Sequence, residues 1–244
     1  MSTGDNLPVL IVGDVHGDIE RLFAALKPYP AGQWNTVFVG DLVDYGMFGV
    51  GVLRYARDRP NTTVLLGNHE AAMLWALRDA TRIGWWMSIG GHRHDLDELA
   101  RDASLQNWLR ERPALVRLAD ATLAQHCGHD GYARFLESSD PDPITSINRR
   151  ISELLKQEGE ALLWDVMSAR NVFGSQPARL DAWLEVTGCR RVVFGHTPHS
   201  SRTPEVYFGG RAINFDGGLS RSHLRHRRSS PLEASVAPLG VLSF

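Results

Sequence analysis

Four short apolar runs, each ending in glycine and then a polar residue, are the strongest pattern along the chain. Runs this short, rich in valine and leucine and bounded by glycine, are typical of strands buried on both faces of a sheet. In α/β proteins, ligands bind just beyond the carboxyl ends of such strands, which is where the polar residues would fall. The four segments are Val9–Asp14, Val37–Asp41, Val64–Asn68 and Val192–His196.

Helical periodicity separates the first three runs. Apolar residues at positions 19, 22, 23 and 26 predict a helix with one apolar face, and Asp18 is placed to cap its start. Weaker helical patterns follow at 52–56 and 70–77. Residues 8–78 therefore predict a β-α-β-α-β-α order and a parallel sheet with helices layered on it, as in an α/β fold.

The segment 79–190 lacks this alternation, and we interpret it as a mostly helical insertion or cap within one domain that spans residues 1–244. Leucine and tryptophan positions between 96 and 109 predict short helices, and segments 114–118 and 122–125 predict two strands. A break at Asp140–Pro143 precedes a further helix.

Aromatic residues and glycines give this middle segment its other features. Trp85-Trp86 and Gly90-Gly91 predict an irregular loop, and His92 and His94 follow it in a region that we expect to be a surface loop. The five tryptophans from Trp75 to Trp164 predict core positions rather than a platform on which bases stack.

Two features follow the fourth apolar run. Residues 206–215 predict a hairpin with Gly209-Gly210 at its turn. Residues 221–230 carry four arginines, for which a solvated loop is the favoured interpretation and a docking site for phosphate or nucleic acid is the alternative.

Composition narrows the class of protein. The chain has 244 residues, 43% of them hydrophobic and 22% charged, which excludes disordered and low-complexity classes. A formal net charge of −2 gives no reason to expect a broad nucleic-acid surface or an anionic membrane as partner. The two cysteines form no C-x-x-C pair, and the N-terminal residues resemble neither a signal peptide nor a membrane span. We therefore expect a cytoplasmic protein.

The candidate chemistry lies in residues that can ligate a metal. Ten histidines against two cysteines favour imidazole chemistry over a thiolate site. Carboxylate, amide and imidazole donors together suit a divalent ion such as Mn²⁺, Fe or Zn²⁺ rather than a structural zinc cage. A central carboxylate such as Asp41 is a natural bridge between two ions. The expected ligands are Asp14, His16, Asp41, Asn68, His126 and His196.

Two further residues have the chemistry of an acid pair. Two metals about 3.5–4 Å apart can activate a bridging water and neutralise charge on a phosphoryl oxygen. The leaving oxygen then needs a proton, which His69 is placed to supply, and Asp44 could keep that imidazole protonated.

The motifs around these residues resemble those of calcineurin-like metallophosphoesterases. Within that superfamily the chain is most similar to small bacterial and phage members of the phosphoprotein-phosphatase type, which include Ser/Thr protein phosphatases and symmetrical diadenosine tetraphosphatases. The similarity is weakest at about 80–120 and at 132–190. Five motifs occur in the family's order: Gly13-Asp-Val-His-Gly17, Gly40-Asp-Leu-Val-Asp-Tyr-Gly46, Gly67-Asn-His-Glu70, His126-Cys-Gly128 and Gly195-His-Thr197.

The resemblance implies a fold, a ligand order and a mechanism. The implied fold is a two-sheet α/β/β/α sandwich, whose second sheet includes the C-terminal strands. Asp14 and His16 would hold one metal and Asp41 would bridge. His69 would be the proton donor. The second metal would be held by Asn68, His126 and His196.

One position departs from the family's pattern. The family's motif usually reads G-D-x-x-D-R-G, with the arginine clamping phosphate, but position 45 here is tyrosine. A single hydroxyl cannot replace a bidentate guanidinium, so phosphoprotein specificity is affected more than metal binding. Arg170 is the candidate for a second substrate-binding arginine.

The leading hypothesis is a dinuclear metal-dependent phosphoester hydrolase in which a metal-bridging hydroxide attacks phosphorus directly, most simply a phosphomonoesterase of the Ser/Thr protein phosphatase type. The alternative is a hydrolase of dinucleoside polyphosphates or phosphodiesters, and a remote one is a non-catalytic binding module on the same fold. Manganese is the preferred metal, and the expected partner is a phosphorylated protein, nucleotide or small phosphoester.

Overall fold

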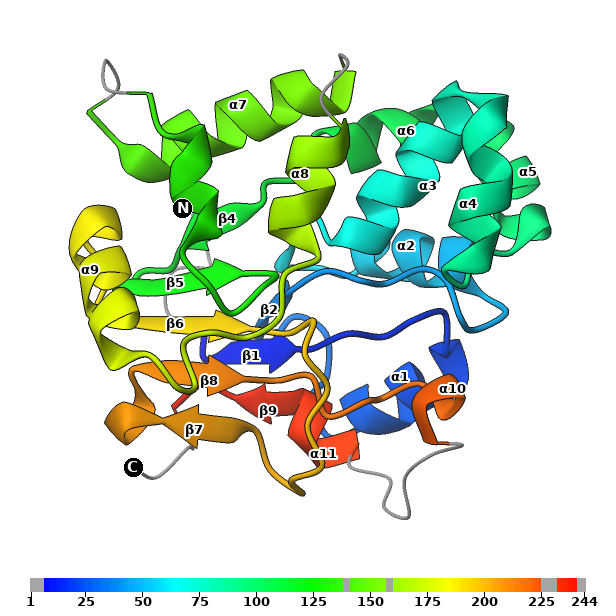
Figure 1. Cartoon of the computed structure of the whole chain (residues 1–244). Coiled ribbons are helices and arrows are strands. Elements are labelled where there is room, and N and C mark those ends of the chain that lie inside the picture. The colour runs from blue at the N-terminus through cyan, green and yellow to red at the C-terminus, as the bar shows by residue number, and fades with distance from the viewer. Residues whose placement is uncertain (1–6, 138–140, 157–159, 225–231, 241–244) are drawn as a thin grey trace, which may run out of the picture.

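A computed structural model describes residues 7–137, 141–156, 160–224 and 232–240 of the chain. Two sheets form its centre (Figure 1). The first has the order β3-β2-β1-β9, in which β1 (Val9–Val12), β2 (Asn35–Phe38) and β3 (Thr62–Val64) run parallel. The antiparallel edge strand β9 (Val236–Pro238) completes it. The parallel sheet predicted for residues 8–78 is therefore confirmed.

The second sheet has the order β4-β5-β6-β8-β7. Its central strands β5 (Thr122–Gln125), β6 (Arg191–Phe194) and β8 (Ala212–Asn214) are parallel to one another. The antiparallel strands β4 (Leu115–Arg117) and β7 (Glu205–Tyr207) lie at its edges. Both predicted strand pairs, at 114–125 and 206–215, are thus present.

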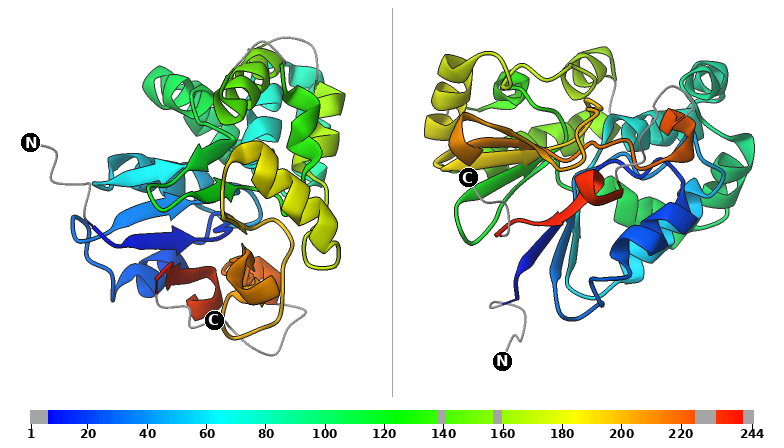
Figure 2. Two further views of the ribbon diagram at one scale, coloured as in Figure 1. Left: turned by 90° about the vertical axis from the view of Figure 1, so that its left-hand side faces the viewer. Right: turned by 90° about the horizontal axis from the view of Figure 1, so that it is seen from below.

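The two sheets pack face to face, with helices on the outer side of each (Figure 2). Ile11 and Val37 from the first sheet meet Val193 and Ile213 from the second in a buried apolar layer. Helices α1 (Ile19–Leu26) and α2 (Gly49–Asp58) cover the first sheet, while α7 (Pro143–Lys156) and α9 (Pro177–Thr187) cover the second. This is the two-sheet α/β/β/α sandwich that the resemblance implies.

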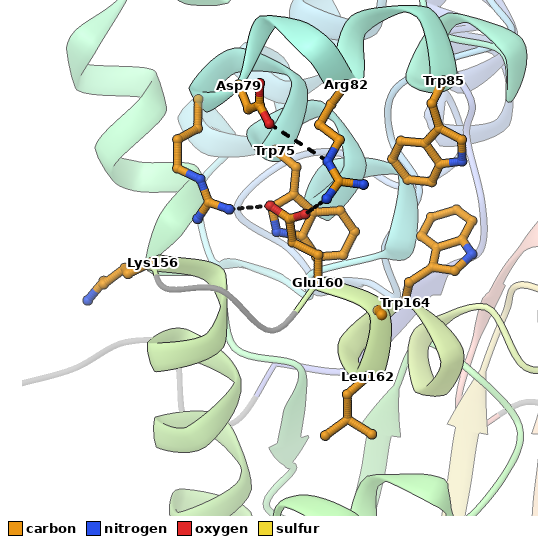
Figure 3. Close-up of a pocket in the computed structure, with 10 residues that line it drawn as sticks. Trp75, Asp79, Arg82, Trp85, Lys156, Glu160, Leu162 and Trp164 are labelled. Atoms are coloured by element: carbon orange, nitrogen blue, oxygen red, sulfur yellow. Dashed lines mark hydrogen bonds and ion pairs between the residues drawn. The ribbon is translucent and has the colours of Figure 1, made fainter.

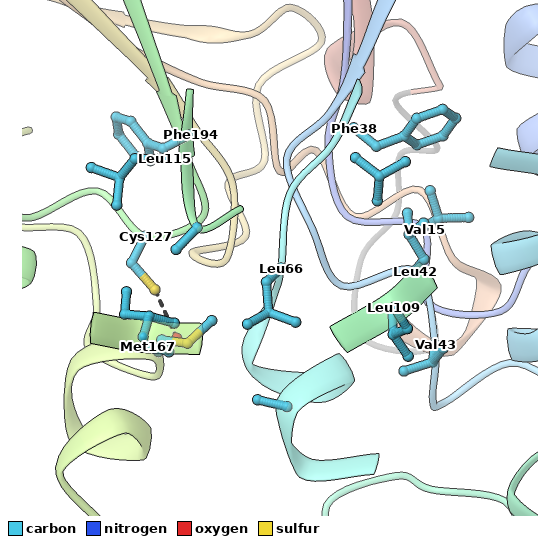
Figure 4. Packing of buried hydrophobic residues seen from close by; sticks show 14 of the residues in the cluster. Val15, Phe38, Leu42, Val43, Leu66, Leu109, Leu115, Cys127, Met167 and Phe194 are labelled. Atoms are coloured by element: carbon cyan, nitrogen blue, oxygen red, sulfur yellow. Dashed lines mark hydrogen bonds between the residues drawn. The ribbon is translucent and has the colours of Figure 1, made fainter. Parts of the chain in front are cut away.

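A larger apolar cluster joins the sheets to the helices. Figure 4 shows Leu66 between Phe38 on the first sheet and Phe194 on the second. Both aromatic rings are fully buried. The cluster continues beneath the loops that follow the strands, through residues such as Val15 and Leu42, and so gives those loops a rigid base.

Further helices lie above the two sheets in the view of Figure 1. They are α3 (Asn68–Arg78), α4 (Ile83–Ser88), α5 (Arg93–Ala100), α6 (Ala103–Arg110) and α8 (Glu160–Met167). Short helices α10 (Arg221–Leu224) and α11 (Leu232–Ser235) lie near the C-terminal end. Short 3₁₀ segments occur at Ala80–Arg82, Gly131–Phe135 and Phe208–Gly210.

Three local predictions need correction. Trp85 and Trp86 lie on helix α4 and not in an irregular loop, because the fully buried Trp86 packs this turn into the core. His94 lies on helix α5, which begins immediately after His92. Phe23 is 47% exposed, although it belongs to the apolar pattern of α1, and its ring meets the edge of Tyr55.

Asp18 caps α1 as predicted, since its carboxylate accepts the backbone N–H of Arg21. Of the arginines at 221–230, Arg221 forms ion pairs with Asp18 and Glu20. Those at 225, 227 and 228 lie outside the described residues. Among the described helices, none has the length and apolar content needed to cross a membrane.

Candidate metal centre

The residues expected to ligate metal come together where the strands of both sheets end. Asp14 and His16 follow β1, and Asp41 follows β2. His126 and His196 follow β5 and β6 of the other sheet, and Asn68 is the first residue of α3. Figure 1 shows β1, β5 and β6 pointing the same way, so their carboxyl ends meet across the sandwich. All six side chains are buried.

Asp41 lies at the middle of this cluster. Its Oδ2 atom is 3.3 Å from Nε2 of His126 and 3.9 Å from Nε2 of His16. Nδ1 of His196 and Nε2 of His69 are each 4.0 Å from the same oxygen. One carboxylate oxygen therefore faces four imidazoles that come from four different segments of the chain.

The remaining donors extend the cluster on either side. Oδ2 of Asp14 lies 3.8 Å from Nε2 of His16, and Oδ1 of Asn68 lies 2.9 Å from Nε2 of His126. Two sets of candidate metal-ligating atoms, each within 4.8 Å of one another, share Asp41: one with His16 and His69, and one with Asp14 and His126. The geometry thus offers neighbouring groups of donors joined through one carboxylate.

Hydrogen bonds on the far side of two imidazoles turn their other nitrogens toward the cluster. Nδ1 of His126 lies 3.0 Å from the Val39 carbonyl, and Nδ1 of His16 lies 3.1 Å from the Val43 carbonyl. A carbonyl only accepts, so each Nδ1 carries the proton, and a neutral ring then presents the lone pair of Nε2. A carbonyl behind a ligating histidine orients metal ligands in this way.

The cluster has the electrostatic character of a cation site. Its donors are carboxylate, amide and imidazole groups, and Nδ1 of His196 faces Oδ2 of Asp41 across 4.0 Å. Burial, together with the charges of Asp216 and Asp41, raises the pKa of Asp14 well above its usual value. A divalent ion would relieve this repulsion and occupy the lone pairs, so the residues present fit a metal centre.

Several of these residues have a left-handed backbone. The φ angles are 48° at His16, 52° at Asp41 and 63° at His196, and those of Asp44 and Tyr45 are 68° and 59°. Such conformations cost roughly 1–3 kcal/mol each in a residue with a side chain, and they collect at functional sites. Here they turn the chain sharply at the strand ends, so that consecutive side chains face the cluster.

Glu70 holds two of these turns together. Its carboxylate accepts backbone N–H groups from Asp41 at 2.9 Å, Leu42 at 2.6 Å, Val43 at 3.2 Å and Gly67 at 2.8 Å. Burial and the nearby Asp41 charge raise the pKa of Glu70 to about 7. The residue was not predicted to support the site, although its place at the third position of a helix is a capping-box signal.

Two glycines allow the carboxylates to lie against the backbone. A Cβ atom on Gly195 would fall 2.1 Å from Oδ1 of Asp14, and one on Gly67 would fall 2.2 Å from Oδ1 of Asp41. Both glycines belong to sequence motifs that contain expected ligands. Their role is steric, because any side chain at either position would displace a carboxylate.

His69 and Asp44 form a buried pair beside Asp41. Nδ1 of His69 lies 2.7 Å from Oδ2 of Asp44, so the ring donates to the carboxylate there. Burial alone would lower the pKa of His69, but the charge of Asp41 and the bond to Asp44 raise it to about 9. Nε1 of Trp86 donates to both oxygens of Asp44 at 3.1 Å. Sequence reasoning missed this contact, because no local signal links position 86 to position 44.

Tyr45 and Arg170 lie at the edge of the cluster. The Tyr45 ring meets His16 edge-on at 4.9 Å and lies 5.3 Å from His69, with 41% of the residue exposed. Nη1 of Arg170 donates to the carbonyl of His196 at 3.0 Å. Tyrosine at position 45 thus places an aromatic surface beside the site.

The other histidines near the site hold its loops. Nε2 of His92 lies 3.2 Å from the carbonyl of Tyr45, and Nε2 of His94 lies 2.8 Å from that of Met47. His199 is not one of the expected ligands, and its Nε2 lies 3.1 Å from the carbonyl of Asn214.

A two-sheet sandwich with carboxylate, amide and imidazole donors at its strand ends defines the metallophosphoesterase class. The profile of the calcineurin-like phosphoesterase family matches residues 7–200, and the chain belongs to this family of phosphoester hydrolases. The family implies divalent metal ions as cofactors, in agreement with the buried His/Asp cluster.

Relatives carry more specific names. A protein of Actinobacillus pleuropneumoniae named symmetrical bis(5'-nucleosyl)-tetraphosphatase is 36% identical over 111 residues, which are 44% of this chain and 39% of that protein. A Yersinia enterocolitica protein of the same name is 30% identical over 190 residues, 75% of this chain and 59% of that protein. The chain therefore spans only about two fifths to three fifths of these relatives' length.

The fold is also found in solved structures. A cold-active protein-tyrosine phosphatase of a Shewanella species superimposes with a TM-score of 0.65 at 20% identity, over 88% of this chain and 72% of that one. At this identity the likeness extends to the fold alone.

Proposed function

We propose that this protein is a metal-dependent phosphoester hydrolase whose substrate is a dinucleoside polyphosphate, cleaved at a phosphoric anhydride bond. The observation that carries the proposal is the buried cluster around Asp41, with four imidazoles facing one carboxylate oxygen. Manganese is the metal that we expect, and a cytoplasmic location stays a prediction.

Six residues would hold the metals. Two divalent ions, when bound, supply an activated water and neutralise charge on the phosphoryl oxygens. Asp41 is the candidate bridge. Glu70 keeps its loop in place, and the left-handed turns at the strand ends aim the donors inward. The proposed ligands are Asp14, His16, Asp41, Asn68, His126 and His196.

His69 would act as the general acid. Its Nδ1–H is donated to Asp44, so Nε2 is the nitrogen that can give a proton to the leaving oxygen. The charge of Asp44 and Asp41 favours the protonated ring at neutral pH, since the pKa of His69 is raised to about 9. Trp86 holds both oxygens of Asp44 and so keeps the pair aligned.

Two observations favour a nucleotide over a phosphoprotein. The curated relatives are named for the hydrolysis of bis(5'-nucleosyl) tetraphosphates. Position 45 carries an aromatic ring in place of the phosphate-clamping arginine that is usual in the family's motif, which weakens the case for a phosphoprotein substrate. Arg170 is close enough to the site to contact a phosphate there. The preference for a Ser/Thr-phosphatase-type monoesterase gains no specific support from these relatives, whereas the alternative kept beside it matches their names.

Product analysis tests the proposal. Mn²⁺-loaded protein is incubated with diadenosine tetraphosphate and, separately, with a phosphoserine peptide. We expect ADP as the main product of the first reaction, at a kcat/KM at least tenfold above that for phosphate release from the peptide. Release of phosphate from the peptide without any ADP from the dinucleotide would contradict the proposal and restore the phosphoprotein hypothesis.

A further inference from the structure

A cavity of about 920 Å³ opens between helices α3, α4 and α8. This volume lies in the range of small-molecule sites, about 300–1,000 Å³. None of the proposed metal ligands lines it. Figure 3 shows tryptophan side chains in its walls and charged side chains at its rim, and Ala161 and Leu162 also line it. We call it the tryptophan pocket and define it by Trp75, Trp85, Trp164, Arg78, Arg82 and Glu160.

Three indole rings converge on this pocket. The rings of Trp85 and Trp164 meet edge to face with centroids 4.9 Å apart. The Trp75 ring lies 6.3 Å from Trp85 and 6.4 Å from Trp164. Trp85 and Trp164 are only partly buried, so each keeps ring surface for another planar group.

Trp75 carries a polar atom that the described residues leave without an acceptor. The residue is 2% exposed, and its Nε1 has no hydrogen-bond partner there. A buried indole N–H usually has an acceptor. Its ring lines the pocket and forms part of the aromatic surface.

Charged side chains hold the pocket's two walls together. Glu160, at the start of α8, forms ion pairs with Arg78 of α3 and with Arg82, the latter at 2.5 Å. Nη1 of Arg78 also donates to the carbonyl of Leu155 at 3.1 Å. Because these contacts fix α8 against α3, the aromatic walls are arranged before any ligand arrives, which lowers the entropy cost of binding.

The helices that form the pocket also reach the metal centre. Helix α3 begins at Asn68, and Trp75 follows seven residues later, about 10 Å along the helix axis at 1.5 Å per residue. Trp86 donates to Asp44, while the adjacent Trp85 lines the pocket. A phosphate chain and a ribose can bridge such a distance.

We propose that the tryptophan pocket binds the nucleobase of the nucleotide whose phosphates are hydrolysed at the metal centre. This inference rests on the proposed function and adds the part of the substrate that gives it specificity. The base stacks on the open ring surface of Trp85 or Trp164. Its ring nitrogens and exocyclic groups meet the guanidinium donors and carboxylate acceptors of the rim. Purines bind better than pyrimidines, because the larger ring covers more of the indole.

The charged rim favours a nucleobase over an apolar peptide side chain as the ligand. Two guanidinium groups and the Glu160 carboxylate border the aromatic walls. A leucine or phenylalanine side chain would cover these groups without offering them hydrogen bonds, which costs free energy. A nucleobase has donors and acceptors at its edge and a flat apolar face, and so matches both parts of the pocket.

Product inhibition measures the contribution of the base. Hydrolysis of an aryl phosphate by the Mn²⁺-loaded protein is inhibited with ADP and, separately, with inorganic pyrophosphate. These share the diphosphate but only ADP has a base. Stacking of one base corresponds to about a five- to 150-fold change in affinity. We expect ADP to inhibit more tightly than pyrophosphate by at least fivefold, and CDP to fall between them.

Substitutions of the pocket tryptophans test whether the base contributes to affinity through this pocket. In Trp164→Ala and in Trp85→Ala, the ratio of the pyrophosphate Ki to the ADP Ki should fall toward one. The matched control is Trp108→Ala, which removes a half-buried indole stacked under Arg112 outside the pocket, and its ratio should stay at the wild-type value. Thermal melts identify any variant that fails to fold, and two independent pocket variants keep the test decisive.

The outcomes separate this inference from the proposed function. An unchanged ratio in both folded pocket variants, with ADP still released from diadenosine tetraphosphate, would overturn the pocket's role and leave the activity standing. A ratio that falls in both variants, with no hydrolysis of the dinucleotide, would support a base site while overturning the proposed substrate. Loss of phosphopeptide turnover alone in the pocket variants would assign the pocket to a peptide and contradict the inference.

Discussion

The Asp41 carboxylate is buried and yet charged. Burial acts to raise its pKa, but the neighbouring imidazoles of His126 and His69 lower that pKa well below its usual value. The carboxylate therefore stays ionised at the point where four imidazoles meet. The same negative charge is what a pair of divalent ions would require.

Replacing this charge should remove the metals and the activity together. Asp41→Asn is expected to lower kcat for aryl phosphate hydrolysis at least 100-fold and to reduce the metal retained per chain, as measured by elemental analysis. Asp97→Asn is the control, since Asp97 lies on the surface of α5 in an ion pair with Arg93. Full turnover in Asp41→Asn would refute the bridging role.

The acid role of His69 predicts a dependence on the leaving group. His69→Asn should lower kcat by about 10²- to 10⁴-fold for an alkyl phosphate, whose leaving oxygen needs a proton. For p-nitrophenyl phosphate the loss should be at least tenfold smaller, because nitrophenolate departs without one. Equal losses for both substrates, at an unchanged metal content, would exclude His69 as the acid.

The sequence predicted most of the side chains that the structure brings together in the cluster. Polar residues that follow glycine at strand ends are recognisable along the chain. The six expected ligands, together with His69 and Asp44, could therefore be found from the sequence and its motifs. Trp86 could not be found in this way, because its bond to Asp44 joins positions 42 residues apart. The roles of these residues stay predictions until the variants are measured.

Buried polar contacts between a helix and a loop hold the site in place. Glu70, in the first turn of α3, accepts N–H groups from the loop that carries Asp41. This one carboxylate therefore connects the end of β2 with the start of α3. The strained left-handed turn at Asp41 persists because that contact holds it.

Replacing one oxygen of the Glu70 carboxylate should destabilise the fold. Glu70→Gln converts one oxygen to an amide donor that faces backbone N–H groups, and we expect a loss of about 1–3 kcal/mol in the free energy of unfolding. Urea denaturation provides the measurement. Glu153→Gln, at an exposed ion pair with Arg150, should change it by less than about 0.5 kcal/mol. Similar values for the two variants would show that Glu70 does not support the loop.

The elements that sequence patterns missed are those decided by tertiary packing. Helix α4 contains Gly84 and two adjacent tryptophans, a local sequence that favours no helix. It forms because Trp86 fills the space beside Asp44 while Trp85 lies against Trp164. The strand predicted at 64–66 instead starts at Thr62 and ends at Val64, although Leu65 still donates its N–H to Phe38.

The whole molecule is two sheets whose strand ends share one site. Apolar residues from both sheets form a single layer between them, so the positions of His126 and His196 relative to Asp14 and Asp41 depend on the complete sandwich. Sequence periodicity predicted the first sheet, and the family resemblance supplied the second. Strands β4 and β5 lie within residues 79–190 and belong to the second sheet. The interpretation of this range as an insertion stays a prediction.

Global stability should fall in acid through His129. The ring is buried, with Nε2–H donated to the carbonyl of Val166 and Nδ1 accepting the N–H of Gly131, and burial lowers its pKa to about 4. The unfolded chain, with an ordinary histidine pKa near 6.5, takes up a proton between pH 6.5 and 4 that the folded protein does not. Unfolding therefore becomes easier as the pH falls.

Urea unfolding of metal-free protein at pH 7.5 and 5.0 measures this effect. Wild-type protein should lose about 2 kcal/mol more over this interval than His129→Gln, which has no group to titrate there. Other titrating groups contribute equally to both proteins and cancel in the difference. Equal losses in the two proteins would show that His129 is not neutral in the folded state.

The buried cluster around Asp41 is proposed as the metal centre of a phosphoester hydrolase. Its most direct test is a titration of chelator-stripped protein with Mn²⁺ while hydrolysis of an aryl phosphate is followed. We expect no turnover without metal, and a rate that rises with added Mn²⁺ and saturates at two equivalents per chain. Turnover that is independent of added metal, or no turnover at any metal concentration, would contradict it.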